Sequence, residues 1–230
     1  MFKNLKIIGT SHIAKDSVKQ IEQEFLDFKP DIMAVELDTK RYNSLLFEKN
    51  NKISLNLVKK VGFTGFMFLI IGRFVQKKLG SIVGVEPGSD MKTAVELAKK
   101  NNKKITLIDR DIDITLKRFS KKFSFKEKMR LLKDLLFGFY SKKKISINLS
   151  KVPDQKLISF LITELKERYP SIYLVLIEER NKFMAKKLFF MMKQDSNAKI
   201  LCVVGAGHEE GLMSELKKLY YSNISLVPEK

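Results

Sequence analysis

Two copies of a Gly-x-x-His turn carry the only histidines of the chain, so chemistry is sought there first. His12 closes Gly9-Thr10-Ser11-His12 near the start, and His208 closes Gly205-Ala206-Gly207-His208 near the end. Imidazole titrates near neutral pH and is the commonest metal ligand in proteins. Two histidines in matching settings therefore predict one site assembled from both ends of the chain. For each histidine taken alone, a hydrogen-bonded turn residue is the alternative.

Each Gly-x-x-His turn directly follows an apolar run, and two acidic residues also follow such runs. The four runs predict buried parallel strands at residues 5–8, 31–35, 104–108 and 199–204. They lead into His12, Glu36, Asp109 and His208, respectively. Ligands of open α/β sheets bind outside the carboxyl ends of the strands. We therefore expect these four side chains to converge on one edge of a sheet.

The acidic residues also have structural interpretations. Asp38 or Thr39 is suited to cap a helix that follows the strand, but this leaves Glu36 unexplained between Val35 and Leu37. A carboxylate in an apolar stretch needs a partner or a reason to be charged. Asp109-Arg110-Asp111 can be a structural ion-pair cluster as readily as part of a functional site.

The spacing of the strands predicts an α/β fold with a mainly parallel central sheet and helices on both faces. A chain of 230 residues with 44% hydrophobic content fits a single domain, 1–230. Helical periodicity dominates at about 53–80 and 123–193, where we expect helical insertions that build a cap or an interface.

Two apolar segments lie within these insertions. The run from Phe63 to Gly72 is interrupted by Arg73 and is shorter than the roughly 20 apolar residues that span a bilayer. It predicts a buried core helix, a homodimer face or an apolar substrate groove. A second apolar surface, from Phe183 to Met192, fits the core or a peptide-binding groove.

The charge and the cysteine content limit which partners and which cellular location we expect. The net charge of +18 is compatible with an anionic membrane surface or simply with a solvated lysine-rich surface. No nucleic-acid-binding motif is present, so no specific nucleic-acid partner is expected. Cys202 is the single cysteine, which excludes an internal disulfide. With no signal sequence or transmembrane segment, the expected location is cytoplasmic, with peripheral membrane association as an option.

Several motifs in order give the chain a family resemblance. The stretches that carry it are Gly9 to Val18, Pro30 to Asp38 with Arg41, Gly84 to Met91 with Ala94 and Ala98, Ile108 to Ile112 with Thr115, Leu116 and Arg118, Glu179-Arg180-Asn181 with Met184 and Ala185, and Val203 to His208. Together they resemble the TraB/PrgY family over nearly the whole chain. Many archaeal members of that family continue into a hydrophobic membrane tail, whereas the sequence here ends at Lys230.

The resemblance implies a relationship to Tiki-type metalloproteases and, more remotely, to erythromycin esterase and haem-binding ChaN-like proteins. Tiki-type members use two Gly-x-x-His motifs and a glutamate for divalent-metal-dependent peptide cleavage. These residues map onto His12, His208 and Glu36. Asp90 is a departure, because the family usually has glutamate there and aspartate is shorter by one methylene.

The expected activity is therefore metal-dependent hydrolysis, with a peptide as substrate. Glu36 would be a ligand or the base, and Arg110 and Arg180 would clamp a substrate carboxylate or an oxyanion. Further candidate ligands or their supporting partners are Glu86, Asp90, Asp109 and Glu179. A donor set of imidazole and carboxylate without thiolate favours manganese, with zinc or cobalt as alternatives. The competing hypothesis is a non-catalytic TraB-family protein that sequesters a peptide or scaffolds a membrane-associated assembly.

Overall fold

The computed structural model describes residues 2–10, 15–46, 56–70, 88–137 and 155–224. Its centre is a parallel four-stranded sheet in the order β1-β4-β2-β3. The strands are β1 (Leu5–Thr10), β4 (Ile200–Gly205), β2 (Ile32–Val35) and β3 (Lys104–Leu107). All four fall on the predicted runs, so the predicted parallel sheet is confirmed.

The two inner strands explain why the apolar runs are continuous rather than alternating. Every residue of β2 and β4 is buried, because helices cover both faces of the sheet. Val35 is in register with Val203, and Thr10 with Gly205. The three strands β1, β2 and β4 therefore end close together, at what we call the carboxyl edge of the sheet. Cys202 lies at the middle of β4, fully buried, and burial raises the pKa of its thiol.

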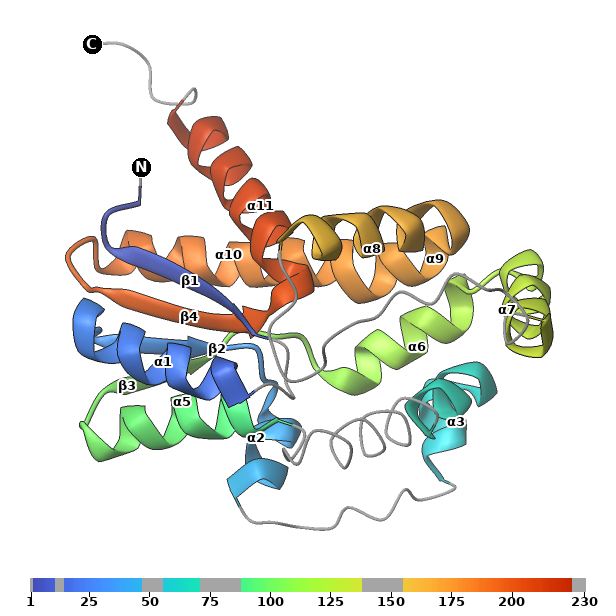
Figure 1. Cartoon of the computed structure of the whole chain (residues 1–230), viewed down its shortest axis with the longest axis horizontal. Coiled ribbons are helices and arrows are strands. Elements are labelled where there is room, and N and C mark those ends of the chain that lie inside the picture. The colour runs from blue at the N-terminus through green and yellow to red at the C-terminus, as the bar shows by residue number, and fades with distance from the viewer. Residues whose placement is uncertain (1, 11–14, 47–55, 71–87, 138–154, 225–230) are drawn as a thin grey trace.

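Helices cover both faces, as the sequence predicts (Figure 1). On one face lie α1 (Lys15–Phe28) and α5 (Ser89–Lys100), whose side chains Ile21 and Met91 pack with Met33 and Val203. On the other face lie α10 (Glu179–Gln194) and α11 (Ala206–Ile224). Alternate residues of each inner strand point to opposite faces, so one strand anchors both layers.

A group of helices lies beyond the carboxyl edge (Figure 1). It contains α3 (Leu57–Val61), the helical residues 63–70, α6 (Ile112–Lys122), α7 (Phe125–Phe137), α8 (Gln155–Arg168), α9 (Pro170–Tyr173) and the π-helical turn η2 (Leu174–Glu178). Phe119, Phe123 and Val175 form a separate apolar core there. The position suits a cap, and the division into a domain with two insertions stays a prediction.

The two apolar segments of the sequence divide between core and surface. Phe66 is buried against Val61 and Leu116, whereas Phe63 is 70% exposed. Residues 71 and 72 of that run lie outside the described residues. In the second segment Met184, Leu188 and Phe189 pack under the sheet, which supports the core interpretation for these three residues. In the described part of the chain, no helix is long and apolar enough to cross a bilayer.

Candidate functional site

Glu36 is the first residue after β2 and turns inward at the carboxyl edge, where it is 4% exposed. Its Oε2 accepts the backbone N–H of Gly205 over 2.6 Å, which ties the end of β2 to the end of β4. Its Oε1 accepts a hydrogen bond from Arg180 and lies 3.5 Å from Nε2 of His208. The carboxylate that the sequence left unexplained therefore lies at the centre of a buried polar network.

His208 lies in the first turn of α11 and is also buried. Its Nδ1 is 2.7 Å from Oδ1 of Asn181, and its Nε2 is 2.9 Å from Nη1 of Arg180. An amide oxygen only accepts and a guanidinium only donates, so both contacts fit a neutral imidazole with its proton on Nδ1. The lone pair of Nε2 then accepts the hydrogen bond from Arg180, with Oε1 of Glu36 3.5 Å away.

The glycine of α11 at position 211 makes this arrangement possible. A Cβ at Gly211 would lie 2.2 Å from Nδ2 of Asn181. The missing side chain lets α10 and α11 approach closely enough for Asn181 to reach His208.

Arg180 joins three elements. Its Nη2 and Nε donate to Asp109 over 2.7 and 3.1 Å, and its Nη1 donates to the carbonyl of Leu176 over 3.1 Å. Burial alone would lower the pKa of Arg180, but the carboxylates of Glu36 and Asp109 outweigh it and raise the pKa. The guanidinium is therefore a fixed positive charge between two carboxylates.

Asp109 and Asp38 complete the network through Arg41. Burial would raise the pKa of Asp109, but the charges of Arg180 and Arg41 hold it below its usual value. Asp38 caps α2 (Thr39–Leu46), as predicted, by accepting the N–H groups of Lys40 and Arg41 over 2.8 and 3.1 Å. It also accepts from the Arg41 side chain over 2.7 Å. We call Glu36, Asp38, Asp109, Arg41 and Arg180 the arginine–carboxylate cluster: its three carboxylates outnumber its two guanidiniums.

Asp90 lies in the first turn of α5, buried beside the end of β1. It accepts the hydroxyl of Thr10 and, over 2.8 Å, the N–H of Met91. Thr10 precedes His12 by two residues in the sequence. His12 itself and Glu86 lie outside the described residues, so their predicted roles stay predictions.

Arg110 and Glu179 form a different cluster. Nη1 of Arg110 donates to Glu179 over 3.0 Å, and Nε of Arg110 donates to Thr115 over 3.2 Å. Glu179 also accepts two hydrogen bonds from Arg118, over 2.6 and 2.5 Å. These contacts link α6 to α10, and within the described residues neither side chain contacts Glu36 or His208.

The arrangement has donors of the right kind for a divalent metal. Protein nitrogen and oxygen ligands lie about 2.0–2.2 Å from such an ion, so atoms 3.5 Å apart, Nε2 of His208 and Oε1 of Glu36, can share one. Among the described residues, no three His, Cys, Asp or Glu side chains are arranged to hold a metal. A third ligand would have to come from elsewhere, and the resemblance assigns that role to His12.

A small cavity adjoins the site. It has a volume of about 290 Å³ and is bordered by Asn181, Gly207 and Gly211 on one side and by Ile158 and Ile162 of α8 on the other. The open space therefore lies next to Asn181, the residue that is hydrogen-bonded to His208.

Sequence reasoning brought Glu36, Asp109 and His208 to one edge but gave no role to Asn181 or Arg41. Both residues lie within the motifs that carry the family resemblance, so a signal was present. Their contacts run from one helix to another or to a distant strand end, and no local pattern predicts such pairs.

Comparison with known proteins assigns nearly the whole chain to one family. Residues 3–222 match the model of the TraB/PrgY/gumN family. An uncharacterized protein of Methanocaldococcus jannaschii is 41% identical over 221 residues, which cover 96% of this chain and 55% of the relative. The TraB domain-containing proteins of human and mouse are 26% and 25% identical over 90% of this chain and 61% of their own length. The chain thus spans little more than half the length of these relatives, and it belongs to the TraB/PrgY/gumN family.

Proposed function

We propose that the protein is a divalent-metal-dependent hydrolase and that its substrate is a peptide. The observation that carries the proposal is the approach of Glu36 and His208 at the carboxyl edge, with 3.5 Å between Oε1 and Nε2. Both side chains are buried, and each is oriented by a second contact, Glu36 by the N–H of Gly205 and His208 by Asn181. Such orienting partners are what ligands and bases of hydrolytic sites require.

In this proposal His208, Glu36 and His12 would hold the metal, and Nε2 of His208 would exchange its hydrogen bond from Arg180 for the ion. The metal would supply a water whose pKa is lowered toward neutrality. Glu36 has two assignments, as a ligand through Oε1 or as the base that accepts the proton of that water. A buried donor set of imidazole and carboxylate favours manganese, with zinc or cobalt as alternatives. The excess of carboxylates in the arginine–carboxylate cluster favours a cation nearby.

Arg180 is suited to stabilise the negative charge that develops on the substrate carbonyl during hydrolysis. Its guanidinium is held by Glu36 and Asp109 and lies 2.9 Å from Nε2 of His208, so a peptide carbonyl bound beside this histidine would lie within its reach. A fixed donor there stabilises the oxyanion that develops on that carbonyl. The cavity behind Asn181 and Gly207 offers space for a small side chain of the peptide.

The test combines metal analysis with peptide cleavage. Purified protein is loaded with manganese, zinc or cobalt, its metal content is measured, and a peptide library is incubated with and without chelator. His208→Ala and His12→Ala should each lower metal occupancy, and Glu36→Gln should abolish turnover while sparing metal if Glu36 is the base. Lys217→Gln, a change at an exposed position of the same helix as His208, is the matched control. Wild-type protein that binds no divalent metal and cleaves no peptide would refute the proposal.

One observation favours a second candidate, a non-catalytic TraB-family protein that sequesters a peptide or scaffolds an assembly. Arg180 engages Glu36 and Asp109 together, so both carboxylates also satisfy a purely structural role. In that case Glu36→Gln and His208→Ala would leave peptide binding unchanged in the presence of chelator.

A further inference from the structure

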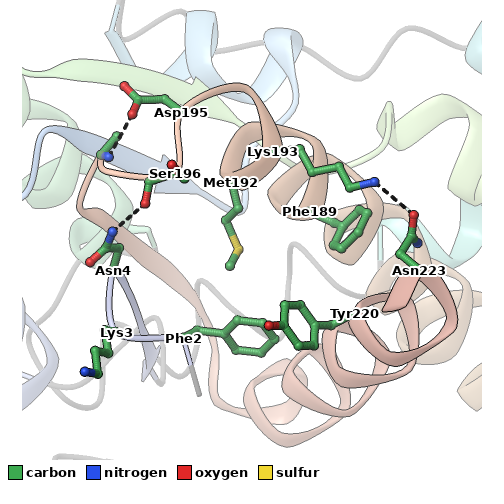
Figure 2. Close-up of a pocket in the computed structure, with 11 residues that line it drawn as sticks. Phe2, Lys3, Asn4, Phe189, Met192, Lys193, Asp195, Ser196, Tyr220 and Asn223 are labelled. Atoms are coloured by element: carbon green, nitrogen blue, oxygen red, sulfur yellow. Dashed lines mark hydrogen bonds between the residues drawn. The ribbon is translucent and has the colours of Figure 1, made fainter. Parts of the chain in front are cut away.

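A second cavity lies at the opposite end of the sheet, where β1 and β4 begin. We call it the amino-edge pocket; it has a volume of about 780 Å³, within the range of small-molecule sites. Four of its side chains present apolar surface: Phe2 before β1, Phe189 and Met192 on α10, and Tyr220 on α11 (Figure 2). Phe2 and Tyr220 pack edge to face with their ring centres 5.4 Å apart.

The polar groups in the wall are largely engaged with one another. Oδ1 of Asp195 accepts the N–H groups of Asn197 and Ala198 over 3.1 and 3.0 Å. Nδ2 of Asn4 donates to the carbonyl of Ser196 over 2.6 Å. These contacts hold the turn between α10 and β4 and leave the aromatic rings and Met192 to face the hollow (Figure 2).

The margin of the pocket carries two lysines, Lys193 and Lys3, and one carboxylate, that of Asp195. Nζ of Lys193 lies 5.0 Å from the centre of the Phe189 ring and donates to Oδ1 of Asn223 over 2.9 Å. An ammonium has three donors, and this neutral acceptor takes one of them. Lys3 lies on another side of the pocket (Figure 2). Within the described residues, no carboxylate lies in an ion pair with Lys193 or Lys3.

We propose that the amino-edge pocket binds a single-chain amphiphile with an anionic head, such as a long-chain carboxylate. Its apolar chain would lie on Phe2, Met192 and Tyr220, which removes apolar surface from water. Its head would pair with Lys193, whose ammonium lies at the edge of that surface over Phe189. The two lysines of the margin outnumber the single carboxylate of Asp195, so its net charge favours an anionic head over a neutral or cationic one. This site is independent of the carboxyl edge and needs no metal.

The chain offers a clean reporter because it contains no tryptophan. Tyr220→Trp puts one indole in the pocket wall and keeps an aromatic ring against Phe2. Titration with monomeric dodecanoate, below the concentration at which it forms micelles, should shift the indole emission in a saturable way with one ligand per chain. Phe125→Trp, on an exposed position of α7, is the matched reporter that should not respond.

Head-group selectivity tests the second half of the proposal. In the Tyr220→Trp background, dodecanoate should bind about two- to fivefold more tightly than dodecanol, the range expected for one exposed ion pair. Dodecyltrimethylammonium should bind more weakly still. Lys193→Gln should remove the preference for carboxylate over alcohol, whereas Lys186→Gln, an exposed lysine on the same helix, should preserve it.

Three results would overturn the inference. Equal affinity for the three head groups would show that Lys193 selects nothing. An equal response from Phe125→Trp would show that the amphiphile coats the cationic protein at many places. Binding only to anionic vesicles, or a dimer by light scattering that dodecanoate does not dissociate, would assign the pocket to a membrane surface or to a second copy of the chain.

Discussion

The two ends of one parallel sheet are built on different physical principles. At the carboxyl edge, five buried or part-buried charged side chains hold one another through ion pairs that reach from β2 to α10. At the amino edge, aromatic and methionine side chains face an open hollow, and the charged groups stay in contact with solvent. Buried charges are tolerable only while every partner is present, whereas apolar contacts can be lost one at a time. We therefore expect changes at the carboxyl edge to be severe and changes at the amino edge to be graded.

The largest effect is expected for Arg180→Leu. The change leaves Glu36 and Asp109 without the charge that lies between them, and removing one partner of a buried ion pair typically costs about 3–5 kcal/mol. The free energy of unfolding, measured in urea by circular dichroism, should fall by that amount. Arg168→Leu is the control, because Arg168 pairs with Asp134 at the surface and should cost less than about 1 kcal/mol. Similar losses for the two variants would erase the proposed contrast.

Acid should weaken the carboxyl edge through Asp109. An unfolded aspartate titrates near pH 3.9, and the pKa of Asp109 in the folded protein is lower because Arg180 and Arg41 stabilise its charge. The stability that this carboxylate contributes is therefore present above the unfolded pKa and is lost as pH falls through the folded pKa, by about 1.4 kcal/mol for each unit of difference.

The free energy of unfolding of wild-type protein should accordingly decrease more steeply from pH 6 to pH 3 than that of Asp109→Asn. Lys182→Gln, which removes a surface ion pair with Glu178, gives the reference slope. Parallel curves for wild type and Asp109→Asn would contradict the assignment.

Asn181 tests how the network orients His208. Nitrogen chemical shifts of the imidazoles report the tautomer, and with two histidines in the chain a His12→Gln variant assigns both. We expect the proton of His208 on Nδ1 in wild type and in Asn181→Asp, which keeps an acceptor. Asn181→Leu removes the acceptor and should cost about 1–3 kcal/mol of stability with a changed tautomer population. A proton on Nε2 in the wild-type protein would disprove the orientation we describe.

The smallest effect is expected at the amino edge. Tyr220→Ala removes an edge-to-face contact with Phe2, and such aromatic pairs contribute about 0.5–1.5 kcal/mol. The midpoint of urea unfolding should fall slightly with no change in its pH dependence between pH 6 and pH 3. If Tyr220→Ala were as damaging as Arg180→Leu, the two ends would not differ as we propose.

The sheet and its carboxyl edge were predictable because both depend on local signals. Continuous apolar runs indicate buried parallel strands, and parallel strands of one sheet end at one edge, so Glu36, Asp109 and His208 could be placed together without knowing the strand order. The order β1-β4-β2-β3 itself depends on which runs pair, and the runs are too alike in composition to reveal it.

The partners of these residues were less predictable. Arg110 and Arg180 look equivalent in the sequence, yet the guanidinium of Arg180 reaches Glu36 and that of Arg110 reaches Glu179. The difference depends on which carboxylates the packing of α10 brings beside each guanidinium, and no local pattern encodes that. Likewise, the closeness of Asn181 to His208 depends on the absence of a side chain at Gly211, a residue on another helix.

The burial of Cys202 makes its reaction with thiol reagents a measure of how often the core opens. It is the chain's single thiol, it lies in β4, one of the two inner strands, and its raised pKa keeps it protonated and unreactive while it is buried. The thiol packs in the core that α10 and α11 form with the sheet, so a thiol-specific reagent can modify the protein only when that layer opens. The rate of modification, measured by mass spectrometry without any engineered label, reports how often this layer of the core opens.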